Sequence, residues 1–135
     1  MPIIEWTDEL SVKISIFDNE HKKLIAIINK LYDAMSQGQG NKLMNDIIIE
    51  LHDYTKTHFK HEEEIMQKYD YPNFAEQKRS HDEFVAKLAE TQEKYQKGTL
   101  VLSVPVLTFL KSWVQNHIMK MDRGYSEFLI GKGVK

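Results

Sequence analysis

The sequence predicts an all-α fold, an up-down-up-down antiparallel four-helix bundle with an extended N-terminal arm. Apolar residues recur at helical spacing almost everywhere after residue 18. Glycine, proline and polar residues divide this pattern into four long segments with short connections between them. Long helices joined by short connections pack as antiparallel neighbours, and each apolar stripe is about one helix face wide, as a bundle requires.

The first predicted helix covers about residues 18–37. We expect Asp18 or Asn19 to cap its start and Gly38 to end it. Its apolar side follows i, i+3, i+4, i+7 spacing and consists of Leu24, Ile25, Ile27, Ile28, Leu31, Tyr32 and Met35. This stripe gives the helix one side to bury against its neighbours.

The three other predicted helices cover about residues 41–70, 73–97 and 103–130. Pro72 ends the second helix, because proline disfavours helical backbone at the residue before it, and Gly98 ends the third. The fourth begins with a proline in its first turn, where the missing backbone N–H has no intrahelical partner to lose.

Residues 1–17 precede the first predicted helix and are too apolar for a free tail. Apolar and polar residues alternate from Leu10 to Ile16, a pattern that resembles a short strand. Because no partner strand is visible, we expect an extended arm packed on the bundle. With 135 residues in total, the arm and the helices are expected to form a single domain over residues 1–135.

Composition excludes several classes of function. Lys and Arg total 18 against 20 Asp and Glu, so there is no positive surplus for nucleic acid or an anionic membrane. The absence of cysteine excludes disulfide scaffolds, thiolate zinc sites, iron–sulfur clusters and cysteine nucleophiles. No stretch approaches the roughly 18 apolar residues of a membrane span, and the start lacks a signal-peptide layout. We therefore expect a cytoplasmic protein.

Histidine and carboxylate residues occupy corresponding positions on all four predicted helices. In an antiparallel bundle the starts of the first and third helices lie beside the ends of the second and fourth. Residues four apart, as at 58 and 62 or at 77 and 81, lie about 40° apart on one helix face. Every helix therefore brings candidate ligands to one height, and these are His21, His58, Glu62, Gln77, His81, His117 and Asp122.

This arrangement favours a metal centre. The imidazoles lie on inward apolar stripes, where polar groups without partners would cost several kcal/mol. A single buried histidine is usually a hydrogen-bonded core residue, but four at one height with two carboxylates favour metal ligands. Imidazole and carboxylate without sulfur indicate iron, manganese or zinc, and the set exceeds the needs of one ion, so we expect two bridged ions.

Other polar and aromatic residues near the candidate ligands have simpler interpretations. His52 and His61 lie off the expected site face, and we expect both at the surface. Glu63 and Glu64 continue an acidic run that is typical of a solvated face. Tyr125 is interpreted first of all as core packing.

The spacing and order of these residues resemble the hemerythrin family, most of all its bacterial single-domain members. The family pattern is His, then His-x-x-x-Glu, His-x-x-x-His and His-x-x-x-x-Asp on successive helices. The resemblance covers nearly the whole chain, and the matching positions are His21, His58 with Glu62, Gln77 with His81, and His117 with Asp122.

The resemblance implies a non-haem site of two oxo- or hydroxo-bridged iron ions that binds dioxygen reversibly. It implies that Glu62 and Asp122 bridge the irons, and that His21 and His58 hold the iron that keeps a position open for dioxygen. The other iron would be held by His81, His117 and position 77. The implied oxygen pocket, which would exclude water, consists of Leu24, Phe59, Trp113, Val114 and Ile118.

Two features of the sequence need a structural answer. Position 77 carries glutamine, whose neutral amide oxygen is a weaker donor to iron than imidazole. Gln77 could ligate the second iron through its amide oxygen, water could fill the position, or the second iron could be five-coordinate or partly lost. The glutamine could also be an engineered substitution for histidine, and the sequence does not distinguish this from a natural glutamine. In addition, His117 and Asp122 lie about 140° apart on an ideal helix, so we expect a local distortion between them.

The leading interpretation is an oxygen-binding protein for carriage, storage, delivery or sensing rather than an enzyme, with no catalytic residue apart from the metal ligands. The alternative is a di-iron enzyme acting on peroxide or nitric oxide, favoured if Gln77 leaves an open iron position, or a peroxidase-like side activity. A metal-free helical interaction protein is the third reading. The expected partners are dioxygen or small ligands such as azide, with no nucleic acid or membrane, in a monomer or small homo-oligomer.

Overall fold

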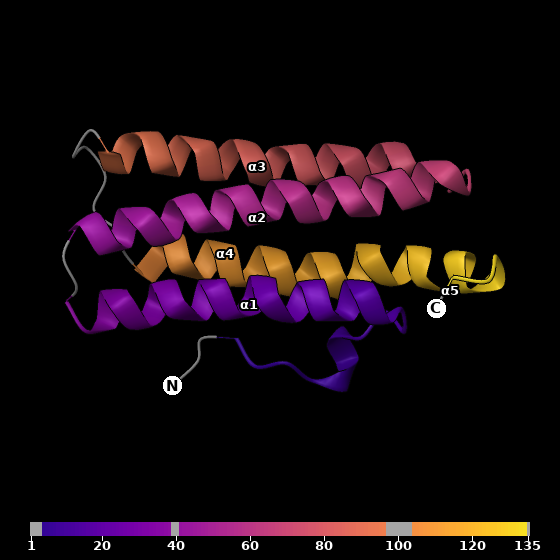
Figure 1. Cartoon of the computed structure of the whole chain (residues 1–135), viewed down its shortest axis with the longest axis horizontal. Helices are drawn as coiled ribbons and strands as arrows, with labels where there is room; N and C mark the ends of the chain where they lie inside the picture. Colours follow the sequence, from indigo (N-terminus) through magenta and orange to yellow (C-terminus); the bar gives the residue numbers. More distant parts are fainter. Residues whose placement is uncertain (1–3, 39–40, 97–103, 135) are drawn as a thin grey trace.

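Four antiparallel helical columns form the molecule, and this confirms the predicted fold class (Figure 1). The structure, a computed structural model, describes residues 4–38, 41–96 and 104–134. The first three columns are single α-helices, and the fourth contains a π-helical segment between two α-helices. Their bounds are α1 Ser15–Ser36, α2 Asn41–Lys68, α3 Phe74–Gln96, α4 Val104–Asn116, η2 His117–Asp122 and α5 Arg123–Gly131.

The core lies between the apolar sides of these columns. Packing of such amphipathic faces, more than intrinsic propensity, stabilises helices in a folded protein. Side chains with at most 2% exposure come from every column, and the large ones include Phe17, Leu24, Ile28, Leu51, Phe84, Leu88, Tyr125 and Leu129. None of the helices in the described ranges has the length and apolar character needed to cross a membrane.

The N-terminal arm packs on the bundle, as predicted. It contains a short 3-10 helix, η1 Asp8–Leu10, and follows α1 in the direction opposite to that helix (Figure 1). The backbone N–H of Ile4 donates to the Asn29 side chain, and the Asn29 amide donates back to the Ile4 carbonyl, both at 2.9 Å. The side chains of Val12 and Ile14 are fully buried.

The predicted start of the first helix is wrong. The helix α1 begins at Ser15 rather than at residue 18, and its N-cap position is Ile14, which has no side-chain cap. The Asp18 carboxylate instead accepts hydrogen bonds from Ser11 Oγ at 2.6 Å and from the Val12 N–H at 2.8 Å. Asp18 therefore fixes the arm to the first turn of α1, which lets the helix begin earlier.

Candidate metal centre

The candidate ligands gather at one end of the bundle. The start of α1, the end of α2, the start of α3 and the end of the fourth column lie together, at the right of Figure 1. All seven positions singled out in the sequence are buried, with exposed fractions between 0% and 5%. Antiparallel topology thus brings together residues that are up to about a hundred positions apart in the sequence.

Two groups of potential metal ligands form within this cluster. The first group is His21, His58 and Glu62, and the second group is His81, His117 and Asp122. In the first group, Glu62 lies 3.2 Å from His58 Nε2 and 3.3 Å from His21 Nε2. In the second, His117 Nε2 lies 3.0 Å from Asp122 Oδ1 and 3.1 Å from His81 Nε2. Each group offers two imidazoles and one carboxylate.

The two carboxylates connect the groups. Glu62 Oε1 lies 3.4 Å from His81 Nε2, although Glu62 belongs to the first group. Asp122 Oδ2 lies 3.2 Å from His21 Nε2, although Asp122 belongs to the second. Each carboxylate therefore reaches imidazoles of both groups.

A π-helical segment aligns His117 with Asp122. In α-helical geometry a spacing of five residues would point these side chains about 140° apart. The segment η2 runs from His117 to Asp122 and has π-helical i→i+5 hydrogen bonding, which places residues five apart one turn above another. The predicted local distortion is confirmed, and it is the reason that both side chains face the same group.

Electrostatic pairing holds the polar cluster in the core. Burial lowers the pKa of His21, but the hydrogen bonds and charges of Asp122 and Glu62 outweigh it and raise that pKa to about 10. Burial also opposes protonation of His58, yet the Glu62 charge and the Glu20 hydrogen bond raise its pKa to about 9. Burial raises the pKa of the Glu62 and Asp122 carboxyls, but neighbouring histidines outweigh it and hold both below their usual range.

The residues present fit a metal centre. Donor atoms bound to one ion at about 2.1 Å, at right angles, lie about 3 Å apart. The imidazole and carboxylate donors of the two groups are separated by 3.0–3.4 Å. Gln77 Oε1 is buried and has no hydrogen-bond partner among the described residues. Closely spaced donors together with an unsatisfied oxygen atom are the pattern expected of a site that takes up cations.

Comparison with known proteins decides the family. The family model of the hemerythrin HHE cation binding domain matches residues 12–129. This chain belongs to the hemerythrin family.

Relatives and solved structures agree over nearly the full length. The bacteriohemerythrin of Stenotrophomonas maltophilia (strain R551-3) is 34% identical over 127 residues, covering 94% of this chain and 82% of that protein. The bacteriohemerythrin of Methylococcus capsulatus is 33% identical over 130 residues, covering 96% and 98%. A crystal structure of wild-type hemerythrin matches with a TM-score of 0.88 and 32% identity, covering 93% of this chain and 96% of that chain.

Gln77 occupies the position where the sequence resemblance implies a histidine. Its side chain is 1% exposed and lies beside the second group. The amide Nε2 donates a hydrogen bond to Asp122 Oδ1 at 3.1 Å, whereas the amide oxygen has no partner among the described residues. The glutamine thus contacts a carboxylate of the candidate site through its nitrogen.

Further polar groups contact the outer nitrogens of the candidate ligands, and sequence reasoning missed them. Glu20 lies 2.8 Å from His58 Nδ1, and Glu63 lies 2.9 Å from His81 Nδ1. Ser80 Oγ lies 3.0 Å from His117 Nδ1. The expectation that Glu63 is solvated is therefore wrong, because its carboxylate turns inward from α2 to α3. The sequence signal was an acidic residue directly beside a ligand position at Glu20 and Glu63.

The surface exposure predicted for His52 and His61 is only partly confirmed. The His61 side chain is 46% exposed, but its Nδ1 lies 2.8 Å from the same Glu20 carboxylate that contacts His58. His52 is half-buried rather than exposed. Glu64 is exposed, as predicted. His61 therefore belongs to the surroundings of the candidate site although it is not in either group.

Tyr125 also contacts the candidate site, beyond the core packing predicted for it. Its hydroxyl donates a hydrogen bond to Glu62 Oε2, and its side chain is fully buried. Burial and the Glu62 charge raise the pKa of the Tyr125 phenol well above its ordinary value, so the hydroxyl keeps its proton. Tyr125 thus serves as a permanent donor to one of the two shared carboxylates.

Aromatic rings cover the second group. Phe59 stacks on His81 with ring centroids 3.8 Å apart, and Trp113 stacks on His117 at 4.4 Å. Phe59 is 3% exposed, and Trp113 is half-buried. The other residues that the sequence placed in the oxygen pocket, all buried, are Leu24, Val114 and Ile118.

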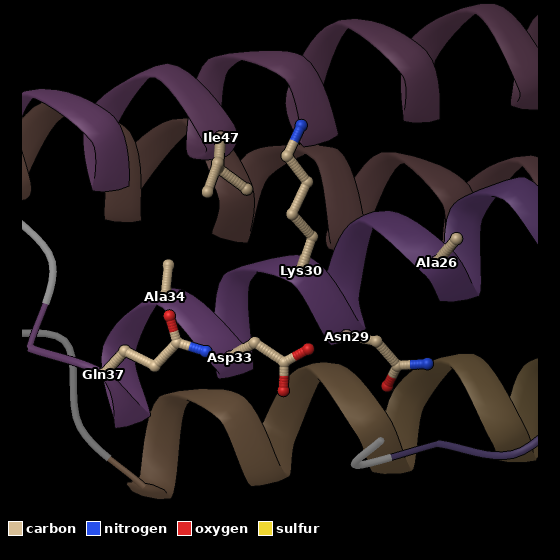
Figure 2. A pocket seen from close by; sticks show the side chains of 7 residues that line it. All are labelled: Ala26, Asn29, Lys30, Asp33, Ala34, Gln37 and Ile47. Carbon is tan, nitrogen blue, oxygen red and sulfur yellow. The ribbon is translucent and has the colours of Figure 1, made fainter. Parts of the chain in front are cut away.

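A surface groove on α1 and α2 lies outside the candidate metal centre. It has a volume of about 450 Å³, and the side chains around it are shown in Figure 2. Lys30, which lines the groove, pairs with Glu50 at 3.1 Å, and Asn29 exchanges two hydrogen bonds with the Ile4 backbone. None of its lining residues belongs to either group; they are Ala26, Asn29, Lys30, Asp33, Ala34, Gln37 and Ile47.

Proposed function

We propose that this hemerythrin binds dioxygen reversibly at a non-haem di-iron centre. The observation that carries the proposal is the pair of ligand groups joined by Glu62 and Asp122. Two iron ions, when bound, supply the electrons and the open coordination position that reversible dioxygen binding needs. The bacteriohemerythrin relatives and the family described as cation binding support this assignment.

Six side chains are proposed as iron ligands. His21 and His58 would hold one ion, and His81 and His117 would hold the other. Glu62 and Asp122 would bridge the two ions, and their contacts to imidazoles of both groups support this role. The oxo or hydroxo bridge between the irons belongs to the same proposal.

The apolar surroundings would protect the bound ligand. We propose that Leu24, Val114 and Ile118, together with the rings of Phe59 and Trp113, line the oxygen pocket. Such side chains exclude water and offer no proton, which slows the loss of superoxide that would leave the irons oxidised. Carriage, storage, delivery and sensing all use this property.

The test is a set of oxygenation cycles on iron-loaded protein followed by absorption spectroscopy. We expect the reduced protein to gain visible absorption with oxygen and to lose it again when oxygen is removed, over several cycles. A Glu62→Gln variant should lose the signal, whereas Glu127→Gln, at an exposed position on α5, should keep it. Oxidation in the first cycle without any reversal would contradict the proposal.

A second candidate is an enzyme that acts on peroxide or nitric oxide at the same centre. The observation that favours it is the Gln77 amide, which turns its nitrogen to Asp122. The expected signature is steady peroxide consumption with a reducing co-substrate, faster in wild type than in Gln77→His. The oxygenated form should also autoxidise faster in wild type than in Gln77→His. Equal autoxidation half-lives in the two proteins would contradict a role for Gln77.

A further inference from the structure

The two ligand groups are chemically equivalent in this structure. Each consists of two imidazoles and one carboxylate, and each carboxylate also approaches the other group. Gln77 is the seventh of the predicted positions, and it contacts Asp122 of the second group. The number of protein ligands available to the second metal therefore depends on whether the Gln77 oxygen binds it.

The hydrogen bond to Asp122 fixes the orientation of the Gln77 amide. Its Nε2 lies 3.1 Å from Asp122 Oδ1, the oxygen that also lies 3.0 Å from His117 Nε2. Nitrogen and oxygen of an amide diverge from one carbon, so an amide that presents its N–H to this carboxylate turns its oxygen away from it. As a neutral donor, the amide oxygen also competes poorly with imidazole for a metal ion.

The Gln77 oxygen nevertheless requires a partner. It is buried, in a side chain that is 1% exposed, and it has no hydrogen-bond partner among the described residues. A buried acceptor left unpaired costs about 1–3 kcal/mol. Small polar molecules such as water satisfy buried acceptors of this kind, because they can donate a proton.

We propose that Gln77 lies outside the coordination shell, holds Asp122 through its N–H, and leaves the second metal with an exchangeable position. Both metals then have such a position, so the centre takes two small ligands per chain instead of one. This inference rests on the proposed di-iron function, and it deepens that function by assigning the number of ligand molecules. A protonated ligand at the second position would have the Gln77 oxygen as its acceptor.

The experiment is an anaerobic nitric oxide titration of iron(II)-loaded protein, followed by absorption, on three chains. Wild type should bind two nitric oxide molecules per chain. Gln77→His supplies a third imidazole to the second metal and should bind one. Gln77→Leu removes both the amide oxygen and the N–H and offers no ligand atom, and it should still bind two, with weaker retention of the second metal. Circular dichroism and iron content are measured on the same samples.

The outcomes separate the possible roles of Gln77. One nitric oxide in wild type and two in Gln77→Leu would overturn the inference, because that result makes Gln77 a ligand. Fewer than two irons per wild-type chain, with two in Gln77→His, would also overturn it. The titration requires no oxygen, so a protein that takes two nitric oxide molecules but fails the oxygenation cycles contradicts the proposed function and not this inference.

Discussion

At the scale of single residues, the side chains behind the candidate ligands set their orientation. Glu20 contacts His58 Nδ1, and Glu63 contacts His81 Nδ1, while the Nε2 atoms of both rings face the Glu62 carboxylate. A carboxylate on the outer nitrogen fixes the tautomer and makes the imidazole a better ligand. The orientation of these rings is therefore built into the protein before any metal binds.

Replacing Glu20 tests this arrangement. We expect Glu20→Ala to weaken metal binding by about 10–100-fold, the usual effect of losing such a partner. Glu50→Ala is the matched control, because Glu50 pairs with Lys30 on the surface, where both side chains are about half exposed. Competition with a chelator of known affinity measures both variants, and equal affinities would contradict the role of Glu20.

The sequence was sufficient to predict which candidate ligands come together, but not which side chains contact their outer nitrogens. Residues such as His58 and His117 lie on apolar stripes at matching helix ends, and periodicity together with antiparallel packing places them near one another. The partner of a ring nitrogen, however, depends on the rotation of the neighbouring helix. Glu63 on α2 contacts His81 on α3, and Tyr125 contacts Glu62 across the bundle, which no local pattern specifies.

At the scale of elements, local distortions decide which side chains reach the site. The five-residue spacing from His117 to Asp122 predicts a distortion, and the structure supplies it as the π-helical segment η2. The start of α1 was mispredicted, because Asp18 bonds to the arm and not to the helix end. Capping preferences describe an isolated helix end, whereas here a tertiary contact takes the capping side chain.

Gly124, in the first turn of α5, allows close contact with Tyr71 in the connection between α2 and α3. A Cβ at this position would lie 2.9 Å from the Tyr71 hydroxyl oxygen, and Tyr71 is only 8% exposed and packs against Tyr125 and Phe128. We expect Gly124→Ala to lower the free energy of unfolding by about 1–2 kcal/mol, as overpacking does.

The matched control is Gly131→Ala at the other end of α5, where an added Cβ meets nothing within 4 Å. Alanine there should be neutral or stabilise by up to about 1 kcal/mol, because it favours helix more than glycine does. Chemical denaturation measures both variants. Tyr71→Phe in the Gly124→Ala background should recover stability, and a failure to do so would contradict the steric explanation.

At the scale of the whole molecule, topology makes the site. Four columns with short connections were predictable because amphipathic periodicity is strong and long, and antiparallel packing then places alternate helix ends together. The same topology concentrates charge, with Glu62 and Asp122 buried among four imidazoles. A monomeric or small oligomeric state and a cytoplasmic location stay predictions.

This charge concentration predicts proton release when metal binds. In the metal-free protein the pKa of His21 is about 10 and that of His58 about 9, so both imidazoles are positively charged at neutral pH. Because the folded-state pKa values of both histidines are raised, their pairing with neighbouring carboxylates stabilises the metal-free fold. This contribution is fully present below the ordinary histidine pKa and is lost as the pH rises through about 9–10.

Metal has to displace these protons, so we expect about two protons to be released from this pair at about pH 7.5. Metal affinity should rise with pH and level off near the raised pKa values. Titration calorimetry in two buffers with different ionisation enthalpies measures the release. Metal binding at about pH 7.5 without any proton release would contradict the pairing described for His21 and His58.

The central claim is that the end of the bundle holds two metal ions between its helices, and iron content tests it most directly. We expect two iron ions per chain in wild-type protein after loosely bound metal is removed. The variant Glu62→Leu/Asp122→Leu, which lacks both shared carboxylates, should retain iron near zero while staying helical. Wild-type protein that retains no more iron than this variant would contradict the account.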